Sequence, residues 1–146
     1  MPETIIERAR VEETINRLFI ATDSADWAAV ERSFTPLVQL DMSSVGGPAK
    51  EMAGAEIAAM WSKGLSHLES VHHQAGNFLI QVNAESASAF CYAIATHYLP
   101  NASGRNTRSF TGSYQFELEK NAGRWMIRAM RFNLKYLDGN PDLESS

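Results

Sequence analysis

Apolar side chains recur at helical spacing through the first 22 residues of the chain. Val11, Ile15, Leu18 and Thr22 fall on one face with charged residues around them, which is the 3.6-residue period of an amphipathic helix. We therefore expect a first helix from Pro2 to Thr22. The turn-forming sequence Asp-Ser-Ala-Asp then interrupts this pattern.

The remainder of the first half predicts shorter elements. In order, these are a helix at 27–33, a strand at 37–42 and a helix from 54 to about 68. Asp26 or Ser24 is placed to cap the helix at 27–33, because short polar side chains accept hydrogen bonds from the free N–H groups of a first turn. Pro36 ends that helix.

The second half changes to long runs of β-branched and aromatic residues separated by short turn-forming segments. Four strands are expected, at 71–82, 87–98, 109–119 and 124–136. Because the connections are short, neighbouring strands are expected to pair as antiparallel hairpins. Helices followed by strands predict an α+β fold, with the N-terminal helices packed on one face of a strongly curved antiparallel sheet.

The length and composition fit one domain. A chain of 146 residues with 45% hydrophobic and 21% charged residues is typical of an ordinary globular protein rather than a disordered or fibrous one. We expect a single domain over residues 1–137. Residues 138–146, which are mostly small and polar, are expected to form a flexible C-terminal tail.

Charge and cysteine content exclude several classes of partner. The formal net charge of −4, without a basic stripe, argues against nucleic acid. Cys91 is the single cysteine, so an internal disulfide is impossible and a reducing compartment is favoured. The N-terminus lacks the pattern of a secretory signal and no apolar run reaches the length of a membrane span. These features predict a cytoplasmic protein without a membrane partner.

Alternation along the last expected strand suggests where a pocket lies. Trp125 and Ile127 share a face with Arg131 and Asn133 if the strand is regular. On that interpretation Arg131 and Asn133 enter the interior near the mouth of a pocket. The alternative is that Arg131 is a rim charge whose aliphatic stem covers the core. The opposite face, which carries Met126, Met130 and Phe132, would then be apolar enough for a homodimer interface.

Two adjacent histidines lie on the first long strand. His72 and His73 must point to opposite faces, so only one of them can face the interior. A regular strand places His72 on the face of Phe78 and Ile80, whereas a bulge at Gly76 would place His73 there instead. Periodicity leaves both possibilities open.

Asp23 follows the apolar face of the first helix, at its C-terminal end. The helix dipole disfavours an anion there by roughly 0.3–1 kcal/mol, so a cationic partner would offset the cost. Asp23 is accordingly either a turn residue or a carboxylate that holds a histidine in one tautomer at the mouth of a pocket.

Several aromatic side chains are candidates for the wall of an apolar pocket. Those we select for substrate binding, together with the polar Asn133, are Trp27, Trp61, Tyr92 and Tyr114. The four histidines do not show metal-ligand spacing with acidic residues, and a glycine-rich phosphate loop is missing from the sequence. We therefore expect chemistry without a cofactor.

The order of elements and several local motifs together resemble the SnoaL-like branch of the nuclear-transport-factor-2-like superfamily, whose fold is a cone-shaped α+β domain. The motifs are Ala21-Thr22-Asp23 followed by Trp27, Phe34 before a short strand, Gly54 to Ile57 at the start of the third helix, His72 to Asn77, and Gly123-Arg-Trp125 leading to Arg131-Phe132. The resemblance covers nearly the whole chain. The superfamily includes polyketide cyclases, scytalone-dehydratase-like enzymes, ketosteroid isomerases and a dehydrochlorinase.

The resemblance also implies a set of catalytic residues. Dehydratase and dehydrochlorinase members use a histidine four residues before an asparagine, which matches His73 rather than His72, with an aspartate after the first helix, which matches Asp23. An arginine six residues after a strand tryptophan matches Arg131. The lysine that the dehydrochlorinase has five residues before its aspartate is Leu18 here.

Three functions are compatible with these observations. The first is a small lyase or isomerase in which His73, held by Asp23, removes a proton from an apolar cyclic or aromatic-derived molecule and Arg131 stabilises the anion. The second is a binding or dimerisation module without catalysis on the same fold. The third is a partner subunit like the small subunit of a ring hydroxylase. An open cavity with unpaired polar groups favours the enzyme, and a cavity filled by aromatic side chains favours the module.

Overall fold

The computed structural model describes residues 2–102 and 104–144, with the helices before most of the strands. The helices are α1 (Pro2–Asp23), α2 (Trp27–Arg32) and α3 (Gly54–Leu65), with one 3-10 turn, η1 (Ser43–Val45). The strands are β1 (Phe34–Asp41), β2 (Ala49–Ala53), β3 (Ser70–Asn83), β4 (Ser86–Tyr98), β5 (Thr107–Asn121) and β6 (Arg124–Gly139). This is the α+β fold that the sequence predicts.

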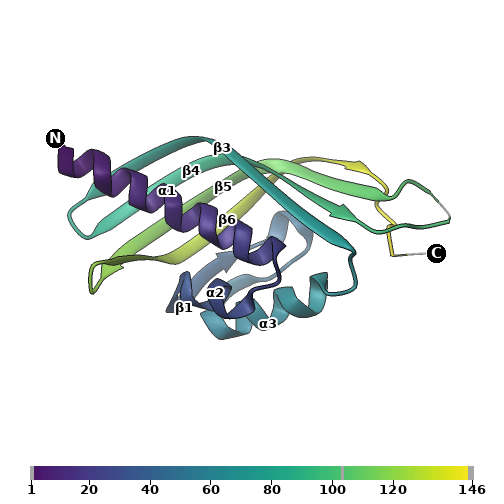
Figure 1. Ribbon diagram of the computed structural model, residues 1–146, viewed down its shortest axis with the longest axis horizontal. Helices are drawn as coiled ribbons and strands as arrows, with labels where there is room; N and C mark the ends of the chain where they lie inside the picture. Colours follow the sequence, from purple (N-terminus) through teal and green to yellow (C-terminus); the bar gives the residue numbers. More distant parts are fainter. Residues whose placement is uncertain (1, 103, 145–146) are drawn as a thin grey trace.

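The six strands form one curved, open sheet in the order β2-β1-β6-β5-β4-β3. In Figure 1 α1 lies across one face of the sheet, while α2 and α3 lie together beside β1. All neighbouring strands pair antiparallel except β1 and β6, which run parallel. The parallel pair differs from the wholly antiparallel sheet that the sequence predicts, and β2 is a strand that the sequence pattern does not predict. That strand is short and polar, and its backbone is held in the sheet by pairing with β1.

The core lies between α1 and the face of the sheet that it covers, which we call the inner face. The apolar positions predicted for α1 are buried, with Val11, Ile15 and Leu18 completely removed from solvent. They pack with inner-face residues of the long strands, such as Phe116 and Leu118. Burying one such side chain stabilises the fold by roughly 1.5–3 kcal/mol, so this periodic stripe is sufficient to dock α1.

A bulge in β6 changes the face on which its side chains lie. Glu117 and Leu118 of β5 are consecutive, but their partners in β6 are Ala129 and Ile127, so Arg128 is an extra residue. Beyond this point the inner positions become Met130 and Phe132, which are both buried, while Trp125 and Ile127 are inner residues before it. The expectation that one regular face continues from Trp125 to Asn133 is therefore wrong, because an inserted residue shifts the two-residue period.

The same bulge changes which side chains of β6 lie on the exposed face of the sheet. Met130 and Phe132 were expected on a surface suited to dimerisation, but both lie in the core. The opposite, outer face instead exposes Leu79, Tyr92 and Ile94.

The segment after β6 packs against the sheet. The sequence predicts a flexible tail over residues 138–146, but β6 continues to Gly139 and Leu143 is completely buried. The Asn101 side-chain amide donates a hydrogen bond of 2.9 Å to the Leu143 carbonyl. Because Asn101 lies 42 residues earlier in the chain, the local sequence does not reveal this anchor. Residues 145–146 of the expected tail lie outside the described residues.

Replacing Leu143 tests this packing. Leu143→Ala is expected to lower the free energy of unfolding by about 2–3 kcal/mol, because it deletes a buried side chain and leaves a cavity. Leu137→Ala is the matched control, since Leu137 is 37% exposed; its cost is expected to be about 1 kcal/mol or less. Urea denaturation of both variants measures the difference. Equal, small losses would mean that residues 140–144 do not contribute to the fold.

Candidate functional site

A cavity of about 390 Å³ opens between α1, α3, the loop after β1 and the inner face of the sheet. Its walls are mostly apolar and include Phe19, Met60, Trp61, Leu65, Phe110 and Phe132. The polar side chains among its lining residues are Thr22, His73, His97 and Tyr114. The Thr22 hydroxyl donates to the Leu18 carbonyl at 2.8 Å and is thereby satisfied within α1. The histidines and the tyrosine therefore supply the chemistry available to a molecule in the cavity.

The end of α1 and the start of β3 meet through Asp23 and His73. One carboxylate oxygen of Asp23 lies 2.6 Å from Nδ1 of His73, and the other accepts the backbone N–H of His73 at 2.8 Å. Side-chain exposure is 11% for His73 and 17% for Asp23. These two donors offset the unfavourable position of an anion at a helix C-terminus.

The contact determines which nitrogen of His73 can act as a base. An ionised carboxylate only accepts hydrogen bonds, so Nδ1 carries the hydrogen in neutral His73 and Nε2 keeps a free lone pair. Phe19, one helical turn before Asp23, stacks on the imidazole with ring centroids 5.1 Å apart and an interplanar angle of 11°. Asp23 and Phe19 together therefore fix both the tautomer and the plane of the ring.

A bulge in β3 decides which histidine faces inward. Gly76 pairs with Tyr92 and Leu79 with Phe90, so β3 contains one extra residue between them. Asn77, within the bulge, has a backbone φ of 57°, in the left-handed region. His73 consequently lies on the same side as Phe78 and lines the cavity, while His72 is exposed. Of the two possibilities left open by periodicity, the one that requires a bulge is present.

His97 is a second cavity histidine, which the sequence analysis did not select. Alternation along β4 places it on the inner face with Cys91, Ala93 and Ala95, and this pattern was visible in the sequence. Its Nδ1 lies 2.9 Å from Nη2 of Arg108. Burial, followed by the positive charge of Arg108, lowers the pKa of His97 from 6.5 to about 4. His97 is therefore neutral at pH 7.

The other predicted site residues are divided between the cavity and the rest of the fold. Trp61 and Tyr114 line the cavity. Burial raises the pKa of Tyr114, so its hydroxyl stays protonated, and among the described residues it has no hydrogen-bond partner. Trp27 packs against the core outside the cavity lining. Tyr92 is on the outer face, 44% exposed, with Nζ of Lys135 4.0 Å from its ring centroid.

Arg131 and Asn133 are not in the cavity. The bulge in β6 directs both away from the inner face, and the side chain of Arg131 is 60% exposed. The nearest acidic group to its guanidinium is Asp41, whose carboxylate lies 3.8 Å from Nε. Of the three residues expected to act in catalysis, the structure therefore brings together Asp23 and His73 and separates Arg131 from them.

Two features are absent from residues 2–102 and 104–144. Within these ranges, no group of three His, Cys, Asp or Glu side chains is arranged to hold a metal ion. None of the helices there combines the length and apolar character that a membrane crossing needs.

Comparison with known proteins identifies relatives at the level of the fold. A family model of the SnoaL-like domain matches residues 3–131. None of the curated proteins matches the sequence. A solved structure of a protein from Kribbella flavida is similar with a TM-score of 0.87 and 19% identity, over 95% of this chain and 97% of that chain.

Two further solved structures carry names that refer to an activity. A protein from Novosphingobium aromaticivorans, provisionally described as a scytalone dehydratase, has a TM-score of 0.83 and 14% identity, over 96% of this chain and 92% of that chain. A hexachlorocyclohexane dehydrochlorinase of type 2 has a TM-score of 0.77 and 13% identity, over 93% and 90%. At these identities the likeness establishes a common fold.

The lowered pKa of His97 predicts how stability depends on pH. Between pH 6.5 and 4 the unfolded chain binds a proton at His97 that the folded chain does not, so the free energy of unfolding falls as the pH falls through this window. From pH 7 to pH 5, His97→Gln is expected to lose about 1–2 kcal/mol less than the wild type, at about 1.4 kcal/mol per pKa unit. Urea denaturation at both pH values measures this. His72→Gln, at an exposed position, serves as control and should lose as much as the wild type; an equal loss in His97→Gln would contradict the prediction.

Proposed function

The chain belongs to the SnoaL-like domain family, and we propose that on this fold it is a small cofactor-independent lyase or isomerase. Its substrate is an apolar cyclic or aromatic-derived molecule from which His73 removes a proton. The observation that carries the proposal is an imidazole held by a carboxylate at 2.6 Å while it lines an apolar cavity.

His73 has the geometry of a general base. Asp23 binds Nδ1–H and leaves the lone pair of Nε2 available for a proton from an acidic C–H bond. As the imidazole becomes positively charged, the Asp23 carboxylate stabilises it at the same contact. A positioned base of this kind contributes roughly 10²–10⁴-fold in rate.

The cavity supports an apolar substrate. Its aromatic and aliphatic walls favour a ring system, and the unpartnered Tyr114 hydroxyl can donate a hydrogen bond that orients a polar substituent. An open cavity with available polar groups favours an enzyme, whereas an interior filled by aromatic side chains would favour a binding or dimerisation module without catalysis. Trp27, which could have filled it, packs elsewhere.

The charges around the cavity argue against elimination of a halide. Leu18 is completely buried at the position where the resemblance to the dehydrochlorinase implies a lysine. Arg131 lies on the outer side of β6, and none of the described lining residues is a lysine or an arginine. A leaving anion would therefore have no cation within the cavity, whereas a reaction stabilised by neutral donors would not need one.

Deuterium exchange tests the proposal without knowledge of the natural substrate. The probe is 2-tetralone, a bicyclic aromatic-derived ketone with acidic C–H bonds, incubated in D₂O and followed by proton NMR. The wild type is expected to accelerate exchange, and His73→Ala is expected to reduce the acceleration by about 10²–10⁴-fold. Asp23→Asn should lose part of the rate because the imidazole is no longer held by a charge.

His72→Ala is the matched control, because His72 is the adjacent residue but is exposed. It should exchange the probe at the wild-type rate, and circular dichroism should show all variants folded. Full activity of His73→Ala would remove His73 from the mechanism. A wild type that binds 2-tetralone without exchanging deuterium would instead support a binding module.

We also propose that the outer face joins two copies of the chain in a homodimer. Leu79, Tyr92 and Ile94 expose large apolar side chains on neighbouring strands of this face. A cluster of exposed apolar side chains on a paired sheet is characteristic of an interaction surface.

Sedimentation velocity tests the homodimer. The wild type is expected to sediment as a particle with twice the 16.2 kDa mass of one chain. Ile94→Glu should sediment as a monomer, because it places a charge in the interface. Ile20→Glu, which changes an isoleucine of α1 that is even more exposed than Ile94, should remain dimeric. A monomeric wild type would refute the proposal.

A further inference from the structure

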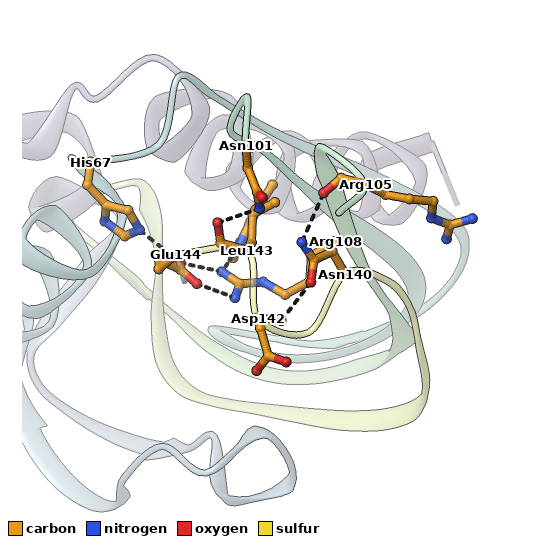
Figure 2. Close-up of polar contacts among 9 residues, drawn as sticks. His67, Asn101, Arg105, Arg108, Asn140, Asp142, Leu143 and Glu144 are labelled. Atoms are coloured by element: carbon orange, nitrogen blue, oxygen red, sulfur yellow. Dashed lines mark hydrogen bonds and ion pairs between the residues drawn. The ribbon is translucent and has the colours of Figure 1, made fainter. Parts of the chain in front are cut away.

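A polar cluster of Arg108, Glu144 and His67 at the end of the sheet contacts His97, which lines the cavity. Glu144 is shared by Arg108 and His67: its carboxylate accepts hydrogen bonds of 2.7 and 2.8 Å from the two terminal nitrogens of Arg108 and lies 2.8 Å from Nε2 of His67 (Figure 2). Hydrogen bonds from Arg108 lower the pKa of Glu144 to about 2. Glu144 and Arg108 are therefore both ionised at neutral pH.

The C-terminal segment brings Glu144 to this position. Leu143 is buried and is held by the Asn101 side chain (Figure 2). The Asn140 backbone N–H donates to the Thr107 carbonyl at 2.8 Å. Thr107 directly precedes Arg108 in β5. The segment thus crosses the end of β5 and presents the Glu144 carboxylate to the Arg108 side chain.

Arg108 in turn contacts His97. Its Nη2 atom lies 2.8 Å from Glu144 and 2.9 Å from Nδ1 of His97. The remaining guanidinium nitrogen, Nε, is buried and has no partner among the described residues. The hydrogen bonds that orient the guanidinium are therefore those to Glu144 and His97.

This contact selects one tautomer of His97. A guanidinium has only N–H donors, so Nδ1 of His97 must accept and the hydrogen of the neutral imidazole must be on Nε2. Protonation of Nδ1 would break this hydrogen bond and place two cations in contact. Nε2 has no hydrogen-bond partner among the described residues, and His97 lines the cavity.

The register places this donor beside the proposed base. His73 pairs with Ala95 across β3 and β4, so His97 is its diagonal neighbour on the same inner face. Diagonal neighbours on one face are about 7–8 Å apart, and both histidines line the same cavity, so that one small molecule can contact both of them. Tyr114 pairs with Cys91, two inner-face positions from Ala95 in the opposite direction.

We propose that Arg108 and Glu144 are positioning residues that hold His97 as a neutral Nε2–H donor, and that this donor binds a carbonyl oxygen of the substrate. The inference rests on the proposed function of His73 and adds the substrate class, an apolar ketone or related carbonyl compound. Nε2 of His73 takes the proton from the carbon next to the carbonyl; the electron pair of the broken C–H bond forms a carbon–carbon double bond, and the π pair of the carbonyl moves to its oxygen. The His97 N–H stabilises the resulting enolate. The carbonyl then re-forms as His73 returns the proton to another carbon of the conjugated system, or to a leaving group that departs with its own bonding pair.

Nitrogen NMR tests the positioning. Long-range proton–nitrogen spectra at pH 7 should show His97 of the wild type as the Nε2–H tautomer. Arg108→Met removes the donor and is expected to give a mixture of tautomers, and Arg108→Lys, which keeps a donor, should restore most of the Nε2–H form. If Arg108→Met does not fold, Glu144→Gln takes its place. This variant is also expected to give a mixture of His97 tautomers. Asp142→Asn is the matched control in the same segment and should leave His97 unchanged.

Binding of two probes tests the role of the donor. The wild type is expected to bind 2-tetralone about tenfold more tightly than tetralin, the same ring system without oxygen, because one neutral hydrogen bond is gained. The preference should disappear in His97→Phe, fall in Arg108→Met and persist in Asp142→Asn.

The outcomes separate this inference from the proposed function. A wild type that does not exchange deuterium but keeps an Arg108-dependent preference for the ketone would overturn the role of His73 and support that of His97. An Nδ1–H tautomer in the wild type would overturn the positioning role. A wild type without preference for the ketone over tetralin, or a preference that survives in His97→Phe, would overturn the donor role.

Discussion

The contact between Asp23 and His73 is the constraint around which the rest of the site is arranged. A carboxylate at the C-terminal end of α1 is unfavourable by itself, and it is accommodated because β3 supplies two N–H donors from one residue. The contact ties the helix to the edge strand of the sheet, and the stacking of Phe19 on the imidazole tightens the connection. The same interaction therefore fixes both the wall of the cavity at α1 and the orientation of the His73 imidazole.

Two bulges decide which polar side chains reach the interior. In β3 the extra residue near Asn77 places His73 on the inner face together with Phe78 and Ile80. In β6 the extra residue at Arg128 has the opposite consequence, since it brings Met130 and Phe132 inside and directs Arg131 outward. Because side chains alternate with a period of two, a single inserted residue is enough to exchange the two faces. The cavity wall consequently includes His73, and none of its described lining residues is a lysine or an arginine.

The C-terminal segment completes the polar end of the cavity. Leu143 is buried and anchors the segment. The Glu144 carboxylate then accepts hydrogen bonds from Arg108, and Arg108 also contacts His97 in the cavity wall. The arginine is separated from the cavity interior by that histidine. Burial, together with the positive charge of Arg108, lowers the pKa of His97 and keeps it neutral at pH 7, while Arg108 itself does not line the cavity.

The sequence by itself determined the fold class, the positions of the helices and long strands, and the pairing of Asp23 with one of two histidines as a hypothesis. Those features depend on local periodicity and on turn-forming residues, which can be recognised within a short segment of the sequence. Family resemblance was needed to prefer His73. Only the tertiary structure decided that Arg131 lies outside the cavity, that residues 140–144 are packed, and that Arg108 and Glu144 stand behind His97. The physical reason is that bulges depend on the partner strand, and that Leu143 and Glu144 bind residues 36 to 77 positions away, so that neither is encoded in local pattern.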